Sequence, residues 1–165
     1  MTMERPAPLT VCFVCTGNTC RSPLAEYVFR SQLERAGLSD QVTVMSAATV
    51  QPRPGLGADP RAVQVLAGRG IDASGHRARH FEPEWFAQLE LVVALDRSNA
   101  GTLSRLASQP ADLDRIHTLL SFDPVQNVLL DVSDPYYSDL RAFERTLATI
   151  EQASEHLLAH VKDLL

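Results

Sequence analysis

The chain has 165 residues, 45% of them apolar, and a formal net charge of −5. This length and composition allow one domain with a sizeable core, and the negative charge disfavours a nucleic-acid-binding protein. The sequence lacks both an apolar run of about 18 residues and a secretory signal at its start, so we expect a cytoplasmic protein without membrane contacts.

Strands and helices are predicted to alternate along the chain. Short apolar runs predict strands over 9–15, 42–47, 89–95 and 115–120. Apolar residues at helical spacing predict helices over 23–36, 60–69, 98–107 and 140–164. This alternation is typical of one domain, over 1–165, with an open parallel sheet and helices on both faces. We expect residues 1–7 to be flexible.

The segment CTGNTCRSP, residues 15–23, follows the first predicted strand. Gly17 can adopt torsions closed to other residues, and Asn18 tolerates a left-handed conformation. Ser22 before Pro23 predicts a helix start with Ser22 as the cap. Because amides at a helix N-terminus bind anions, this loop predicts a phosphate-sized site. Its residues are Thr16, Gly17, Asn18, Thr19, Cys20, Arg21 and Ser22.

Cys15 stands at the carboxyl end of the first predicted strand, where ligands bind in sheets of this kind. A thiol is a good nucleophile only when it is ionised, and the loop amides and the cation of Arg21 favour the thiolate. The Arg21 guanidinium can also bind two phosphoryl oxygens in the transition state. These residues predict displacement at phosphorus through a phosphocysteine intermediate.

The pattern of Cys15, five residues, Arg21 and Ser22 resembles the signature of cysteine-dependent protein tyrosine phosphatases. Its place near the N-terminus is similar to the low-molecular-weight family of bacterial type. This resemblance implies a flavodoxin-like three-layer fold with a four-stranded parallel sheet in the order 2-1-3-4, and neither cofactor nor metal. It also implies a phosphotyrosine protein substrate, inorganic phosphate as product, and a monomer or weak dimer. Further matching segments are SAAT (46–49), DPR (59–61), GHRAR (75–79), ALDRSN (94–99), SFDP (121–124) and DPYY (134–137).

The same resemblance assigns roles to single residues. Asp134 is implied as the acid that protonates the leaving oxygen and later accepts a proton from water. The hydroxyl of Ser22 is implied to donate to the thiolate, although the cap role alone remains an alternative. Asn18 and His76 are implied to maintain the shape of the loop, and Asp96 to orient the site.

The resemblance also predicts the rim of the cleft. Tyr136 and Tyr137 are implied to line it and to be targets of phosphorylation, with ordinary packing as the alternative. After SAAT the family often has an aromatic residue, whereas this chain has Pro52 and Arg53. We therefore expect a more open wall, with Arg53 favouring acidic substrates.

The remaining cysteines and histidines suggest redox chemistry more than metal binding. The family implies that Cys20 forms a disulfide with an oxidised Cys15, which predicts reversible oxidative inactivation. Cys12 and Cys15 spell CxxC, but three positions apart on a strand they face opposite sides, which disfavours zinc. His156 and His160 have the spacing of a metal pair without an evident third ligand, so we expect them to flank the core face of the last helix.

Two alternative functions remain open. Thr19 stands where tyrosine phosphatases of this family usually carry isoleucine, and threonine there is typical of similar protein-arginine phosphatases. DPYY favours phosphotyrosine, which is our main prediction. The other alternative is a non-catalytic phosphate-binding or thiol redox-sensing module. Arsenate reductase shares this scaffold but needs cysteines further along the chain, and this sequence has none after Cys20.

Overall fold

The centre of the molecule is a sheet of four parallel strands in the order β2-β1-β3-β4. The computed structural model describes residues 7–165, so of the segment expected to be flexible, residues 1–6 lie outside the described part. The predicted parallel sheet and its order are confirmed. The strands are β1 (Leu9–Cys15), β2 (Val42–Ala48), β3 (Leu91–Ala94) and β4 (Ile116–Thr118).

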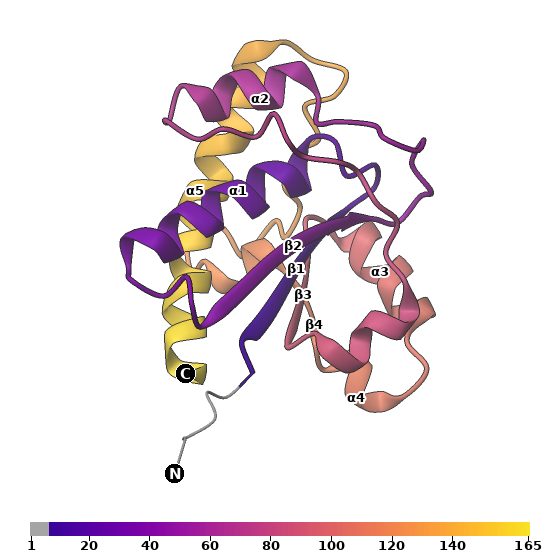
Figure 1. The fold of residues 1–165 in the computed structure, drawn as a ribbon. Coiled ribbons are helices and arrows are strands. Elements are labelled where there is room, and N and C mark those ends of the chain that lie inside the picture. Colours follow the sequence, from indigo (N-terminus) through magenta and orange to yellow (C-terminus); the bar gives the residue numbers. More distant parts are fainter. Residues whose placement is uncertain (1–6) are drawn as a thin grey trace.

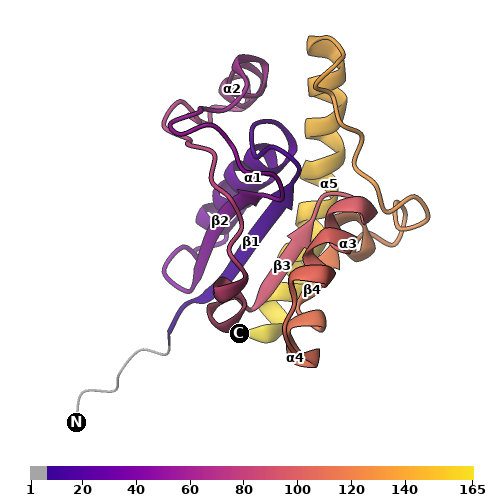
Figure 2. The same ribbon diagram turned by 90° about the vertical axis from the view of Figure 1, so that its right-hand side faces the viewer.

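Helices cover both faces of the sheet, as Figures 1 and 2 show. On β1, Val11, Phe13 and Cys15 belong to the core beneath α1, α2 and α5, while Cys12 and Val14 belong to the core beneath α3. This alternation follows from the two-residue period of a strand, and β1 is buried on both sides because it is a central strand. The α-helices are α1 (Arg21–Arg35), α2 (Pro60–Ala67), α3 (Arg97–Leu106), α4 (Pro110–Leu113) and α5 (Leu140–Leu164).

Two predicted strands are longer than the strands of the structure. The fourth predicted strand is too long, because only Ile116–Thr118 pairs and Leu119–Phe122 forms the 3₁₀ helix η2. The third predicted strand, 89–95, is also too long, because β3 spans Leu91–Ala94 and Leu89 follows the 3₁₀ helix η1 (Pro83–Gln88). In residues 7–165 we find no helix that combines the length and apolar character needed to cross a membrane.

Three segments meet at the carboxyl edge of the sheet. The loop of residues 15–22, called the nucleophile loop below, connects β1 to α1. The turn after β3 leads into α3 through Asp96, whose side chain accepts a hydrogen bond from the Asn99 amide and caps the helix. Residues 131–139, called the acid loop below, join this edge where the Val132 amide donates to the Leu95 carbonyl. The topology therefore brings distant parts of the sequence to the end of β1.

Candidate active site

Cys15 lies at the bottom of a cleft of about 300 Å³ at the carboxyl edge of the sheet. Its Sγ is 2.9 Å from Ser22 Oγ and accepts a hydrogen bond from the Asn18 amide at 3.3 Å. Only 3% of Cys15 is exposed, so a reagent reaches its sulfur through the cleft. The cleft is lined by Cys15, Thr16, Gly17, Thr19, Cys20, Arg21, Val50, Gln51, Pro52, Leu56, Asp134, Tyr136 and Tyr137.

Asn18 holds the nucleophile loop in shape from inside the protein. It is fully buried, and its φ of 55° places it in the left-handed region that the sequence predicted. Its Nδ2 donates to Ser22 Oγ at 2.8 Å and to Ser46 Oγ at 2.9 Å, and its Oδ1 accepts from the Arg79 amide. Its carbonyl lies 2.9 Å from His76 Nε2. One side chain thus connects the loop to β2 and to the segment before η1.

Two local predictions for this loop were wrong. Gly17 has a negative φ, and Asn18 supplies the left-handed residue instead. A Cβ on Gly17 would lie 3.7 Å from Thr19 Oγ1, which is an ordinary contact. Neither the backbone torsion nor the available space therefore requires glycine at this position. Ser22 is not the helix cap, because α1 begins at Arg21, two residues before the predicted start, with Cys20 at the cap position and no side-chain cap bond. The Ser22 hydroxyl bonds Cys15 and Asn18 instead.

Arg21 is buried beside the cleft and held by the turn after β3. Its Nη1 donates to Asp96 Oδ2 at 2.7 Å and to the Val132 carbonyl at 3.0 Å. Burial opposes its charge, but the hydrogen bond to Asp96 and the nearby negative groups raise the pKa of Arg21 above its usual value. Within residues 7–165 its side-chain hydrogen bonds all come from Nη1, so the Nε–Nη2 edge, with Asp134 Oδ2 3.8 Å from Nη2, is the part of the fork left to bind a ligand.

Asp134 lies across the cleft from the nucleophile loop. Its side chain is 47% exposed, with Oδ2 3.8 Å from Arg21 Nη2. Its Oδ1 accepts a hydrogen bond from the Tyr136 amide at 3.1 Å, which turns the carboxylate back along its own loop. A half-exposed carboxyl group beside the cleft can exchange protons with both a bound ligand and solvent.

Three of the four residues predicted at the rim line the cleft. Tyr136 and Tyr137 are 48% and 93% exposed, with ring centroids 4.8 Å apart in an edge-on arrangement. Pro52 lines the cleft with them, whereas Arg53 is not among the lining residues. Sequence reasoning missed three other lining residues, because a loop rich in proline and glycine carries no pattern that marks them. They are Val50, Gln51 and Leu56.

A buried polar chain behind the loop was also missed. Ser46 Oγ donates to Glu26 Oε1 at 2.5 Å, and Glu26 Oε2 accepts from Arg30 Nη2 at 2.6 Å. Glu26 is only 5% exposed on α1, where its helical position alone would not separate it from a surface charge. The network that begins at Cys15 therefore extends through Asn18 and Ser46 to an ion pair.

The cysteines and histidines considered as metal ligands lie in different surroundings. Cys12 lies on the opposite face of β1 from Cys15, and burial raises the pKa of its thiol. His156 Nε2 is 3.8 Å from Asp123 Oδ1, whereas the His160 ring packs on Phe122. In the described part of the chain, His, Cys, Asp and Glu side chains form no group of three or more that could hold a metal ion.

Comparison with known proteins identifies the chain's relatives. The family model for low molecular weight phosphotyrosine protein phosphatase matches residues 10–164. A low molecular weight protein-tyrosine-phosphatase of Streptomyces coelicolor is 49% identical over 93% of this chain and 93% of its own. A protein tyrosine phosphatase structure from Entamoeba histolytica has a TM-score of 0.87 at 27% identity, covering 94% of this chain and 97% of that one. A structure of the YwlE arginine phosphatase has a TM-score of 0.83 at 29% identity, covering 93% of this chain and 96% of the other. A YwlE mutant from Bacillus subtilis matches with the same TM-score and identity.

Proposed function

Because the chain belongs to the low molecular weight phosphotyrosine protein phosphatase family, we propose that it hydrolyses phosphotyrosine in proteins through a phosphocysteine intermediate. The observation that carries this proposal is one cleft lined by Cys15, Arg21 and Asp134. A nucleophile, a cation for the phosphoryl oxygens and a proton donor are the three groups that this chemistry needs.

In the first step the Cys15 thiolate attacks phosphorus, so that the S–P bond forms while the bond from phosphorus to the tyrosyl oxygen breaks. Asp134, in its protonated form, gives its proton to that oxygen and tyrosine leaves neutral. The Nε–Nη2 edge of Arg21 and the loop amides bind the equatorial phosphoryl oxygens, whose charge shifts in the transition state. The ion pair with Asp96 at 2.7 Å supports the orientation of this guanidinium.

In the second step water attacks the phosphocysteine. Asp134, now a carboxylate, accepts a proton from that water while the S–P bond breaks and inorganic phosphate leaves. The hydroxyl of Ser22, 2.9 Å from the sulfur, donates to the departing thiolate. His76 keeps a supporting role through its contact with the Asn18 carbonyl.

The test is paired turnover on a phosphotyrosine peptide and a phosphoarginine peptide, with Cys15→Ser as the blank. We expect kcat/KM to favour phosphotyrosine by more than about tenfold, a transition-state difference beyond about 1.4 kcal/mol. Phosphate binding without Cys15-dependent turnover of either peptide would contradict the proposal and favour the non-catalytic binding module.

Thr19 supports a second candidate, a protein-arginine phosphatase. Its side chain lines the cleft, with Oγ1 3.7 Å from Cys20 Sγ, and this chain is similar to the YwlE arginine phosphatase. A hydroxyl at this position can hydrogen-bond a water and changes the contact with the leaving group, whereas isoleucine offers only an apolar contact. Phosphoarginine turnover above phosphotyrosine turnover in the paired assay, reversed in Thr19→Ile, would establish this candidate.

Cys20 supplies a route to reversible oxidation. Both Cys15 and Cys20 are free thiols in the same loop, and burial raises the pKa of Cys20 to about 12. Peroxide converts the Cys15 thiolate to a sulfenic acid, and attack by the Cys20 sulfur forms the disulfide and releases water. We expect a thiol reductant to restore peroxide-treated enzyme, and Cys20→Ser to lose most of that recovery. Equal recovery in both proteins would contradict this role.

A further inference from the structure

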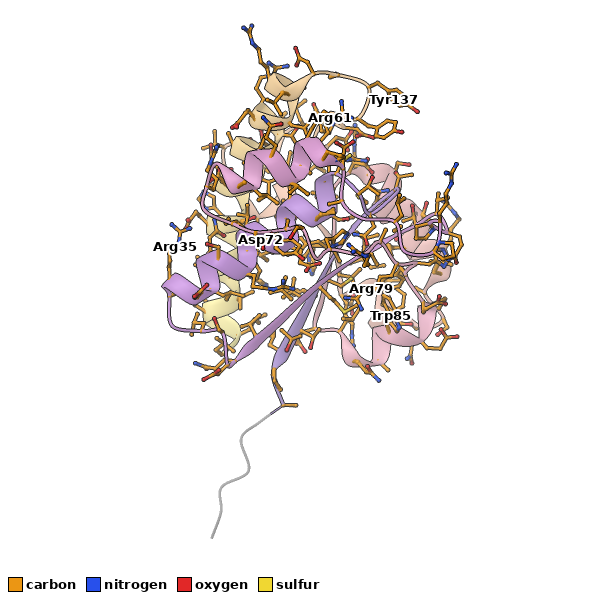
Figure 3. All side chains as sticks on the ribbon, turned by 45° about the horizontal axis from the view of Figure 1, so that its top comes forward. Arg35, Arg61, Asp72, Arg79, Trp85 and Tyr137 are labelled. Carbon is orange, nitrogen blue, oxygen red and sulfur yellow. The ribbon has the colours of Figure 1, made fainter. Side chains whose placement is uncertain are left out.

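Arg61, at the start of α2, contacts the acid loop rather than the cleft. Its Nη1 donates to the Ser138 carbonyl at 2.7 Å and its Nη2 to the Tyr136 carbonyl at 2.9 Å. The guanidinium also lies over the Phe143 ring, 4.4 Å from its centroid. Figure 3 shows Arg61 beside Tyr137, at the end of the molecule where α2 meets this loop. Arg61 thus binds the backbone on the C-terminal side of Asp134.

Arg61 is also connected to the nucleophile loop, through Asp59. Arg61 Nε and Nη2 donate to the two Asp59 carboxylate oxygens at 3.0 and 2.9 Å, and the Arg61 amide also donates to Oδ1. The Asp59 amide donates to the Thr19 carbonyl at 2.8 Å, and Cys20 Sγ lies 3.9 Å from Oδ2. A chain of hydrogen bonds therefore runs from the nucleophile loop to the acid loop.

In residues 7–165, apart from the Arg61 contacts and the Asp139 cap of α5, the hydrogen bonds from other segments to the acid loop lie on the N-terminal side of Asp134. Asp131 pairs with Arg97 at 3.0 Å, the Val132 amide bonds the Leu95 carbonyl, and the Ser133 carbonyl accepts from Thr146 Oγ1. On the C-terminal side, the Ser138 amide bonds the Pro135 carbonyl within the loop itself. In residues 7–165, Arg61 is the side chain from another segment that hydrogen-bonds the loop after Asp134.

We propose that Arg61 is a positioning residue that, with Asp59, sets the placement of Asp134 over Cys15. This inference rests on the proposed phosphatase function. The rigid, planar guanidinium is suited to the task because it can bind a carboxylate and two carbonyls at once, which a lysine ammonium cannot do in the same plane. Without Arg61 the carboxyl group keeps its chemistry but loses a defined position, and proton transfer requires a defined hydrogen-bond geometry.

The test uses two substrates that differ in their need for the acid. Phenyl phosphate releases a strongly basic phenolate and needs protonation, whereas 4-nitrophenyl phosphate releases a weakly basic one. We expect Arg61→Ala to lower kcat/KM for phenyl phosphate by about 30-fold and for 4-nitrophenyl phosphate by less than about threefold. Arg61→Lys should show the same bias with a smaller loss, and it carries the test if Arg61→Ala folds poorly.

Arg69→Ala is the matched control. Arg69 follows α2 and pairs with Glu144 and Glu151 of α5, so this variant loosens the attachment of α2 without removing a contact to the acid loop. We expect it to change kcat/KM by less than about twofold for both substrates. A similar leaving-group bias in Arg69→Ala would overturn the inference, because docking of α2 would then explain the effect.

The double variant Arg61→Ala with Asp134→Asn separates positioning from a general loss of structure. If Arg61 acts through Asp134, its removal adds less than about twofold once the acid is gone. Equal losses of kcat/KM for both substrates, or a full additional loss in the double variant, would overturn the positioning role of Arg61 and leave the proposed phosphatase function standing. A wild type without Cys15-dependent turnover would overturn the proposed function and this role with it.

Discussion

The two loops that meet at the cleft are constructed in opposite ways. In the nucleophile loop, Asn18, Arg21 and Ser22 are buried, and their polar groups bond one another or neighbouring elements. In the acid loop, Asp134 and Tyr137 are exposed, and other segments hold the loop through its backbone and through the Asp131 carboxylate, which pairs with Arg97. One loop is part of the core, and the other is attached to the surface.

This difference separates the effects that substitutions should have. A buried polar group left without its partner costs about 1–3 kcal/mol, so changes in the nucleophile loop should reduce stability and activity together. An exposed carboxylate has water as an alternative partner, so changes in the acid loop should reduce activity alone. Four substitutions test this comparison, from the largest expected effect to the smallest.

Asp134→Asn should have the largest effect on turnover. An amide cannot donate the proton that the leaving oxygen needs, so we expect kcat/KM for phenyl phosphate to fall by about 10²–10³-fold. Because the Asp134 side chain is half exposed, the free energy of unfolding should change by less than about 0.5 kcal/mol. Steady-state kinetics and urea unfolding measure the two quantities. A clear loss of stability would contradict the view that the Asp134 side chain contributes to activity and not to folding.

Asn18→Ala should affect both quantities. It removes the bonds to Ser22, Ser46 and the Arg79 amide and leaves alanine at a φ of 55°. We expect unfolding free energy to fall by about 2–4 kcal/mol and kcat/KM by about 10²-fold. Ser46→Ala, which removes one of these bonds, should show a smaller loss in each. Lost activity with unchanged stability would contradict the buried construction of this loop.

His76 should give the nucleophile loop a pH-dependent stability. Burial lowers the pKa of His76, although its bond to the Asn18 carbonyl works the other way. The unfolded chain then binds the proton more readily, so stability falls as pH drops through about 6.5, by at most about 1.4 kcal/mol per unit from one histidine. His117, whose pKa is also lowered by burial, should add to this slope.

Urea unfolding at pH 7.5 and 5.5 measures this effect. We expect wild type to be less stable at pH 5.5 and His76→Gln to show a shallower dependence, with the part due to His117 remaining. His80→Gln is the control, since it removes a histidine whose Nε2 lies 3.2 Å from the Thr49 carbonyl, outside the nucleophile loop. An unchanged slope in His76→Gln would contradict the expectation.

Tyr137→Ala should have the smallest effect. The side chain is 93% exposed and packs edge-on against Tyr136. We expect stability to remain within about 0.5 kcal/mol and KM for a phosphotyrosine peptide to rise by less than about fivefold, through the loss of an aromatic wall. A change in kcat without a change in KM would show that this rim residue affects the acid loop itself.

The sequence by itself determined the order of elements and the chemistry of the nucleophile loop. The strand and helix periods are local, and Cys15, Asn18, Arg21 and Ser22 come from one short segment whose spacing brings them to a single helix start. Even there a local rule failed for Ser22, because its hydroxyl bonds the sulfur of Cys15 and the side-chain Nδ2 of Asn18 instead of capping α1.

Only the tertiary structure decided what surrounds that loop. Glu26 and Ser46 become one buried network because α1 packs on β2, and Arg61 reaches the acid loop because α2 packs on α5. The family resemblance predicted Arg53 at the rim, but Leu56 lines the cleft and Arg53 does not. Such contacts join residues that are 20 to 77 positions apart. Local periodicity carries no information about contacts at that separation in the sequence, because such contacts depend on how the helices pack on the sheet and on one another.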